Sequence, residues 1–203
     1  MLMLVIGLTG GIGTGKSSVS RFLVEMGARI IDADTIGHDL YLPYSPAWRE
    51  IVKYFGKSVI AGDDKIDRRR LGDLIFNSPG DREKLNSIMV PRMSGIFQKL
   101  IIGLEQKHER VVVLEAAILI ESGWDSLVDE IWMVQAPREM VLKRFEGKGG
   151  LSCKEITKRI ESQISSDERM QNAQVVINNT GSLKELRVKV EKLWDCKITG
   201  EDY

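Results

Sequence analysis

This 203-residue chain has only two cysteines and a formal net charge of zero, and each of these facts excludes a class of protein. The only cysteines, Cys153 and Cys196, lie far apart and form no Cys-x-x-Cys pair, so neither a disulfide framework nor a cysteine zinc site is indicated. The 29 basic residues balance 29 acidic ones, and no long Lys/Arg run is present. The composition therefore creates no overall field that would attract nucleic acid.

Long hydrophobic runs are missing as well. No apolar stretch approaches the roughly 18 residues of a membrane-spanning helix. The first apolar residues are too few and too weakly charged for a signal peptide. We therefore expect a soluble, cytoplasmic protein with no membrane and no nucleic-acid partner. No feature fixes the oligomeric state, and we expect a monomer.

The most informative segment, Gly10–Ser17, reads GGIGTGKS and matches the phosphate-loop pattern. An apolar run precedes it as a buried strand would, and apolar residues with helical spacing follow it. In such a loop, backbone N–H groups and a helix N-terminus face nucleotide phosphates. Lys16 would reach the β and γ phosphates, and Ser17 would bind Mg²⁺. The alternative, a glycine-rich turn that carries Lys-Ser by chance, leaves the flanking strand and helix unexplained.

Five short, Val/Ile-rich runs predict buried strands. They are residues 3–8, 28–33, 111–115, 130–135 and 174–178. Helical patterns separate them, so the alternation predicts an α/β fold with a doubly wound, five-stranded parallel sheet. About 77 residues lie between the second and third runs, far more than a crossover needs, which indicates an inserted helical region. We place the nucleotide-binding core at residues 1–34 and 108–203, a small lid at about 138–165, and the inserted region at 35–107.

Capping residues predict where several helices begin. Ser45, followed by a proline, and Asp67 each precede an apolar helix face in the inserted region. Ser152 and Ser182 each stand three residues before a Glu, which is the pattern of a capping box.

Two carboxylates, Asp32 and Asp34, stand where the second strand should end. Ligands of open α/β sheets bind at the carboxyl ends of strands, so these side chains would face the same crevice as the phosphate loop. A carboxylate there can accept a hydroxyl proton, position the hydroxyl, or hold Mg²⁺ through water. Residues i and i+2 of an extended chain point the same way, which favours a shared functional role. The alternative makes one of them the N-cap of a helix over Thr35–Leu40.

Three consecutive arginines, Arg68–Arg70, follow Asp67 at a predicted helix start. Cations there meet the unfavourable end of the helix dipole. A phosphorylated substrate could compensate, because Arg forms bidentate pairs with phosphate. The alternative is a solvated basic turn.

Another basic group, Lys143, Arg144 and Lys148, adjoins the glycine-rich tip Gly147–Gly150. In a phosphoryl-transfer enzyme, such a segment can close over the γ phosphate and stabilise its charge. Closure also excludes water, which would otherwise hydrolyse the nucleotide.

Together these residues resemble the dephospho-coenzyme A kinase family, a P-loop kinase family. Residues 7–17 and Ile31–Asp34 carry the resemblance first. Further elements agree in order and spacing over nearly the whole chain: Arg68-Arg69 with Leu71, Ile75-Phe76 before Pro79, Leu85-Asn86 before Pro91, Leu142–Arg144, Arg159 with Gln163, and Ala173–Ile177 leading to Asn179 and Gly181. The resemblance implies transfer of the ATP γ-phosphoryl group to the ribose 3′-hydroxyl of dephospho-CoA, the last step of coenzyme A synthesis.

The resemblance also implies roles for individual residues. Asp34 matches the general base, Arg144 the lid side of the catalytic centre, and Asn179 a contact to the adenine region. The ATP phosphate site corresponds to eight residues: Gly11, Ile12, Gly13, Thr14, Gly15, Lys16, Ser17 and Ser18. The acceptor-substrate residues that we predict are Asp32, Arg68, Arg69 and Lys148.

Three positions depart from the family pattern. Val90 precedes Pro91 where the family usually has His, and Lys148 stands where Arg is usual. Glu115 replaces the usual Asp after the third strand and keeps a carboxylate on a longer stem. Valine forms no side-chain hydrogen bond, and lysine lacks the planar fork of arginine. These changes concern substrate affinity and turnover rather than the fold.

Two alternative functions stay open from the sequence. One is another P-loop kinase that acts on a nucleotide or small metabolite, although a long insertion with paired arginines favours a large phosphorylated acceptor. The other is a nucleotide-binding sensor or a catalytically silent paralogue, although Lys16, Ser17 and Asp34 are all present. A switch GTPase is disfavoured because the chain has no Asn-Lys-x-Asp motif.

Overall fold

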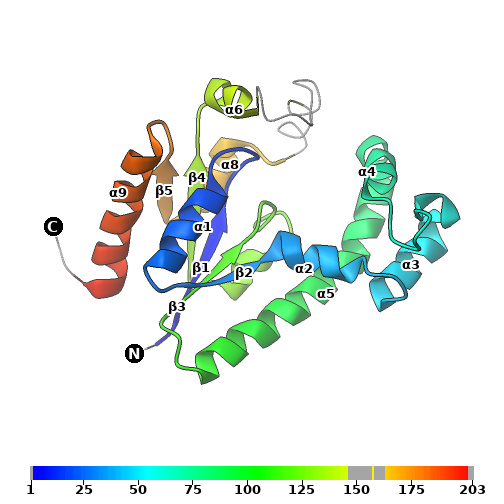
Figure 1. Cartoon of the computed structure of the whole chain (residues 1–203), viewed down its shortest axis with the longest axis horizontal. Helices are drawn as coiled ribbons and strands as arrows, with labels where there is room; N and C mark the ends of the chain where they lie inside the picture. Colours follow the sequence, from blue (N-terminus) through cyan, green and yellow to red (C-terminus); the bar gives the residue numbers. More distant parts are fainter. Residues whose placement is uncertain (1, 146–156, 158–162, 201–203) are drawn as a thin grey trace. The chain divides into compact units, whose positions relative to one another are not determined.

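A computed structural model describes residues 2–145, 157 and 163–200 (Figure 1). The chain divides into two compact units. The first comprises Met1–Ile31 and Ile101–Tyr203 and contains most of the sheet, and the second comprises Asp32–Leu100 and is helical. Among the described residues, no helix is both long and apolar enough to cross a membrane.

The sheet has five strands in the order β2-β3-β1-β4-β5. They are β1 (Leu4–Thr9), β2 (Arg29–Asp32), β3 (Val111–Glu115), β4 (Glu130–Gln135) and β5 (Val175–Asn178). β1 pairs in parallel with β3 and β4, and β4 pairs in parallel with β5. Each strand lies within one residue of its predicted bounds, so the predicted doubly wound parallel sheet is confirmed.

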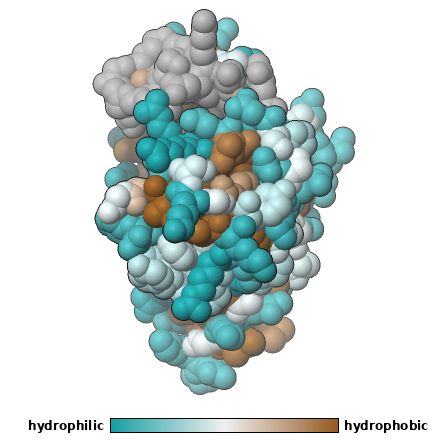
Figure 2. Space-filling model, turned by 90° about the vertical axis from the view of Figure 1, so that its right-hand side faces the viewer, coloured by the Kyte–Doolittle hydropathy of each residue, from teal (hydrophilic) through white to brown (hydrophobic). Residues whose placement is uncertain are grey.

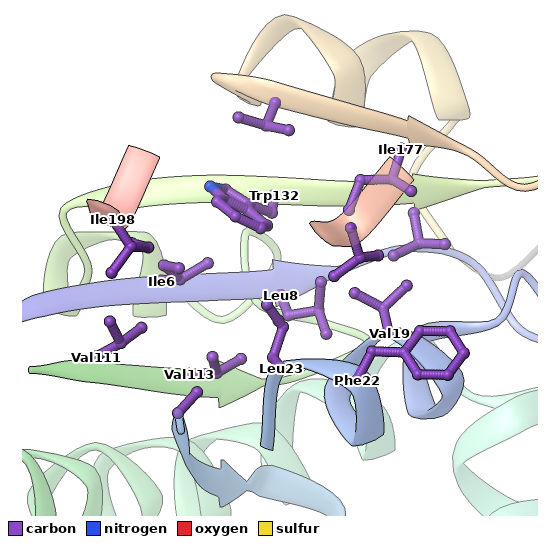
Figure 3. Packing of buried hydrophobic residues seen from close by; sticks show 14 of the residues in the cluster. Ile6, Leu8, Val19, Phe22, Leu23, Val111, Val113, Trp132, Ile177 and Ile198 are labelled. Carbon is purple, nitrogen blue, oxygen red and sulfur yellow. The ribbon is translucent and has the colours of Figure 1, made fainter. Parts of the chain in front are cut away.

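The hydrophobic core of the first unit lies between the sheet and two helices. Helices α1 (Lys16–Glu25) and α9 (Leu183–Trp194) contact each other and contribute side chains to this core. Figure 3 shows Ile6 of β1 beside Trp132 of β4, and Leu8 of β1 beside Leu23 of α1. The other face of β1 is covered too, because a Cβ on Gly7 would come within 2.7 Å of the Leu119 side chain. Burial on both faces explains why β1 and β3 are nearly continuous apolar runs.

Among the described residues, the first unit also contains short helices. They are α6 (Arg138–Phe145) and α8 (Ser166–Gln171), with the 3₁₀ turn η2 (Trp124–Leu127) and the π turn η3 (Asp195–Thr199). The predicted capping box at the start of α9 is confirmed: Ser182 Oγ accepts from the Glu185 N–H, and Glu185 Oε2 accepts from the Ser182 N–H. The capping box predicted at Ser152 lies outside the described residues.

The second unit contains α2 (Ala33–Leu40), α3 (Pro46–Phe55), η1 (Lys57–Val59), α4 (Arg68–Asn77) and most of α5 (Pro79–Gln106). Two predicted caps are confirmed here. Ser45 Oγ accepts from the Trp48 N–H at 3.0 Å, and Asp67 Oδ1 accepts from Arg69 and Arg70 N–H groups at 3.1 Å. Helical structure therefore fills the long interval between β2 and β3.

Candidate active site

The phosphate loop connects the end of β1 to the start of α1 and depends on three glycines with positive φ. Gly10, Gly13 and Gly15 have φ values of 148°, 71° and 107°. A Cβ on Gly10 would lie 2.2 Å from the Val134 carbonyl oxygen, and a Cβ on Gly15 would lie 2.3 Å from Asn179 Nδ2. Only glycine allows this loop to pass so close to its neighbours.

Lys16 and Thr14 stabilise the loop from within. Lys16 Nζ donates to the carbonyl oxygens of Gly10 at 2.9 Å and Gly11 at 3.3 Å. Thr14 Oγ1 also donates to the Gly11 carbonyl, at 2.9 Å. These bonds hold the ammonium charge over the loop, where the sequence pattern predicts the nucleotide phosphates.

A cavity of about 410 Å³ adjoins the loop within the first unit. Its volume falls in the range of small-molecule sites. Its lining residues come from the phosphate loop and α1, from α6, and from the segment after β5: Gly13, Gly15, Lys16, Ser17, Ser18, Arg144, Phe145, Asn179, Gly181 and Leu183. The structure therefore brings five of the eight predicted loop residues to one cavity with Arg144 and Asn179. The other three, Gly11, Ile12 and Thr14, line a smaller neighbouring cavity.

Arg144 and Asn179 hold the Gly13–Thr14 half of the loop. Arg144 Nη1 donates to the carbonyl oxygens of Gly13 at 2.9 Å and Thr14 at 3.1 Å, and its Nη2 donates to the Asn179 carbonyl at 3.1 Å. Asn179 is 6% exposed, and its Nδ2 donates to the Thr14 carbonyl at 2.7 Å. Arg144 and Asn179 thus act on the loop backbone, an arrangement that the sequence patterns alone did not indicate.

Oxygen atoms suited to Mg²⁺ lie at the start of α1. Ser17 Oγ donates to Glu115 Oε1 at 3.4 Å, and Ser20 Oγ donates to Glu115 Oε2 at 2.5 Å. Hydroxyl and carboxylate oxygens are the ligands that Mg²⁺ prefers. No group of three or more His, Cys, Asp or Glu side chains suited to a metal occurs in the part of the chain that the structure describes. A cation here would take its other ligands from phosphate and water.

The argument that Asp32 and Asp34 share an extended segment is wrong. β2 ends at Asp32 and α2 begins at Ala33, because Asp32 caps the helix: its Oδ1 accepts from the Asp34 N–H at 2.9 Å and the Thr35 N–H at 3.2 Å. Asp32 Oδ2 accepts from Thr35 Oγ1 at 2.8 Å. The N-cap alternative is therefore correct for Asp32. Asp34 lies exposed in the first turn of α2.

The three arginines at the start of α4 have different partners. Arg70 pairs with Asp67 at 3.0 Å, which offsets the unfavourable end of the helix dipole. Arg68 Nη1 lies 2.8 Å from His38 Nδ1. The Arg69 side chain is exposed and makes no hydrogen bond or ion pair with another described residue. Arg69 is thus the most accessible of the three for a ligand, and Lys148 lies outside the described residues.

The sequence analysis missed a second set of contacts at the loop. Gln163 Oε1 accepts from the Ile12 N–H at 3.3 Å. Nearby, the Arg169 side chain is only 2% exposed and pairs with Glu121 at 2.8 Å. Gln163 formed part of the family resemblance without an assigned role. No pattern marked Arg169, because an arginine in a short polar helix has the sequence character of a surface residue.

Comparisons with known proteins point to one family over nearly the whole chain. A sequence model of the family described as dephospho-CoA kinase matches residues 4–185. The chain is 41% identical over 199 residues to a dephospho-CoA kinase of Symbiobacterium thermophilum, covering 98% of this chain and 83% of that one. A dephospho-CoA kinase of Carboxydothermus hydrogenoformans is 43% identical over 194 residues, covering 94% and 93%.

A solved structure is also similar to the whole chain. The dephospho-CoA kinase from Campylobacter jejuni superposes with a TM-score of 0.71 at 25% identity, covering 97% of this chain and 98% of that one. The likeness extends over the first and second units of the chain, and not over the phosphate loop alone.

Proposed function

Because the chain belongs to the dephospho-CoA kinase family, kinases that transfer phosphate from ATP, we propose that it phosphorylates the ribose 3′-hydroxyl of dephospho-CoA and releases CoA and ADP. The observation that carries this proposal is the cavity that brings Lys16, Ser17, Arg144 and Asn179 to one glycine loop. A kinase needs a phosphate cradle, positive charge and a cation ligand together, and this cavity supplies all three.

In the proposed reaction, the acceptor oxygen forms a bond to the γ phosphorus while the bond to the β–γ bridging oxygen breaks. Lys16 and Arg144 stabilise the negative charge on the transferred group. Asp34 accepts the proton of the acceptor hydroxyl, and its exposed carboxylate is open to such a contact. A positioned base contributes roughly 10²–10⁴-fold to the rate.

Mg²⁺ is the metal that the donor set at Ser17 and Glu115 fits. We propose that the Ser17 hydroxyl binds the ion directly and that Glu115 orients its ligands. When bound, Mg²⁺ neutralises charge on the β and γ phosphates. The longer stem of Glu115 relative to Asp is accommodated by Ser20, which fixes the second carboxylate oxygen.

The second unit has a surface that suits a large amphipathic acceptor. Several of its apolar side chains are substantially exposed: Leu42, Tyr44, Tyr54, Leu74 and Phe76. On the face shown in Figure 2, apolar surface lies among hydrophilic side chains. Arg69 adds an accessible guanidinium on the same unit. We propose that this unit binds dephospho-CoA, whose charged phosphates and uncharged, partly apolar arm match such a mixed surface.

The test is an ADP-release assay with ATP and Mg²⁺ in which dephospho-CoA is compared with adenosine, AMP, shikimate and no acceptor. We expect ADP release with dephospho-CoA alone, with CoA as the product. Transfer to another of these acceptors would indicate a different P-loop kinase. ATP binding without transfer to any acceptor would indicate a sensor or a silent paralogue.

Asp34→Asn tests the proposed base. We expect kcat to fall at least about a hundredfold while the KM for ATP stays within about twofold, because proton acceptance is lost and the phosphate loop is unchanged. Asp39→Asn is the matched control, since it removes the same charge from an exposed position of α2. Equal turnover in Asp34→Asn and Asp39→Asn would remove Asp34 from the mechanism.

A further inference from the structure

Arg169 is an unusual charged residue because its whole side chain is buried. The side chain is 2% exposed and its ion-pair partner, Glu121, is 20% exposed. By contrast, Arg187 and Glu25 form a surface pair in which the two side chains are 45% and 43% exposed. Burial of an ion pair is costly, because desolvation offsets much of the Coulomb attraction. Stability alone therefore does not account for a charge at this position.

The Arg169 guanidinium is also incompletely hydrogen bonded. Nη2 donates to Glu121 Oε1 at 2.8 Å, whereas Nε is buried without a hydrogen-bond partner among the described residues. A buried donor without a partner destabilises the fold, because its lost hydration is not replaced. Leucine or methionine would avoid that cost at similar volume, so the arginine has a role that an apolar side chain cannot fill.

The surroundings of Arg169 indicate that role. Arg169 and Gln163 line a cavity of about 160 Å³ together with Gly11, Ile12 and Thr14 of the phosphate loop. A Cβ on Gly11 would be 3.7 Å from Gln163 Oε1 and 4.0 Å from Arg169 Nη1, so both side chains lie against this glycine.

Two separate groups thus hold the two halves of the loop. Arg144 and Asn179 bind the carbonyls of the Gly13–Thr14 half, and Gln163 binds the N–H of Ile12 in the other half. Gln163 stands two residues before Ser165, the N-cap of α8, and Arg169 belongs to α8. The Arg169–Glu121 pair therefore connects the helix that follows Gln163 to the segment that follows β3.

We propose that Arg169 is a positioning residue for the phosphate loop. Anchored by Glu121, it fixes the start of α8 so that Gln163 holds the Ile12 N–H, and it places a buried positive charge beside Gly11. Its removal loosens the Gly11–Ile12 half and lowers the affinity for the phosphates of ATP, while the affinity for a ligand without phosphates is unchanged. The proposal rests on the proposed function only in taking ATP as the ligand of the loop, and ATP binding is measurable without turnover.

The experiment compares Arg169→Met, Arg169→Lys and Gln163→Leu with the surface control Arg187→Met. For each variant, the dissociation constants of a non-hydrolysable ATP analogue and of adenosine are measured well below the melting temperature. We expect Arg169→Met to weaken the ATP analogue about tenfold or more, and Gln163→Leu to weaken it severalfold, while adenosine affinity changes less than twofold. Arg169→Lys keeps the charge and should lie between Met and the unchanged protein. Arg187→Met should bind both ligands normally.

A double variant tests whether Arg169 acts through Gln163. In the Gln163→Leu background, Arg169→Met should cause a smaller loss than it does alone, because the two changes disturb one set of contacts. Unchanged ATP affinity in Arg169→Met would overturn the proposal. An equal loss of ATP and adenosine affinity would also overturn it, because that result would show a purely structural role for Arg169. If Arg169→Met does not fold, Gln163→Leu alone decides, and normal ATP affinity in that variant refutes the proposal. Failure of the unchanged protein to phosphorylate dephospho-CoA would refute the proposed function and leave these binding comparisons valid.

Discussion

Gly10→Ala tests whether the close approach of the phosphate loop to β4 is essential. The added Cβ would lie 2.2 Å from the Val134 carbonyl oxygen, at a φ of 148°. Side-chain carbons do not approach other heavy atoms closer than 3.0 Å, so the loop and strand must separate by about 0.8 Å, the difference between 3.0 and 2.2 Å. Neither atom belongs to a flexible side chain, so the backbone itself must move.

The cost can be estimated from two contributions. Backbone strain at a positive φ amounts to about 1–3 kcal/mol, and overpacking adds about 1–3 kcal/mol. The sum of about 2–6 kcal/mol corresponds to a fall in melting temperature of roughly 5–20 °C for a chain of this size. We therefore expect Gly10→Ala to melt well below the unchanged protein and to gain less stability from added ATP.

Gly11→Ala is the matched control in the same loop. A Cβ there would meet Thr14 Cγ2 at 3.5 Å, an ordinary van der Waals distance. This substitution should change the free energy of unfolding by less than about 1 kcal/mol. The assay is thermal unfolding followed by circular dichroism, with and without ATP. Equal melting temperatures for Gly10→Ala and Gly11→Ala would refute the reasoning.

Two further predictions concern the acceptor and the pH dependence of stability. Arg69→Ala should raise the KM for dephospho-CoA about tenfold or more, which is the effect of losing a charge-assisted hydrogen bond. Arg70→Ala should leave this KM nearly unchanged, because Arg70 is already paired. Equal KM values for the two variants would show that Arg69 is a solvated surface residue with no contact to the acceptor. Burial opposes the charge of Glu130, but hydrogen bonds from Lys197 and Trp132 outweigh it and lower the pKa of that carboxyl below 4.5. The ionised Glu130 carboxylate therefore stabilises the fold above pH 4.5, and this contribution is lost as the pH falls through the lower folded pKa. Melting temperatures measured from pH 6 to pH 3 should fall less steeply for Glu130→Gln than for the unchanged protein. Parallel curves for the two proteins would contradict this role of Glu130.

Much of the fold could be predicted from the sequence because its signals are local. Val/Ile runs located the strands, and the side-chain caps at Ser45, Asp67 and Ser182 located helix starts. Such caps act within three residues of the backbone groups that they bind. The phosphate loop was predictable for the same reason, since its glycines, Lys16 and Ser17 lie in one short segment.

The parts that could not be predicted depend on contacts between distant segments. The bonds from Arg144 to the loop carbonyls join residues that are 131 and 130 positions apart, and the Arg169–Glu121 pair spans 48 positions. The prediction that Asp32 and Asp34 share an extended segment was wrong for a different reason. The Asp32 carboxylate competes for the backbone N–H groups that follow it, so the strand ends one residue earlier than its apolar pattern suggested.

The hydrogen bonds from Arg144 and Asn179 to the Thr14 carbonyl also fix the direction of the next N–H group, that of Gly15. In a planar trans peptide, the C=O of one residue and the N–H of the next point in opposite directions. With the Thr14 oxygen bound by two donors, the Gly15 N–H is aimed away from Arg144 and Asn179 before any nucleotide arrives. The peptide dipole is thus oriented in the folding step. If the loop binds ATP as proposed, the phosphate meets a donor that does not have to rotate. Because this peptide group is already ordered in the folded protein, binding loses less conformational entropy.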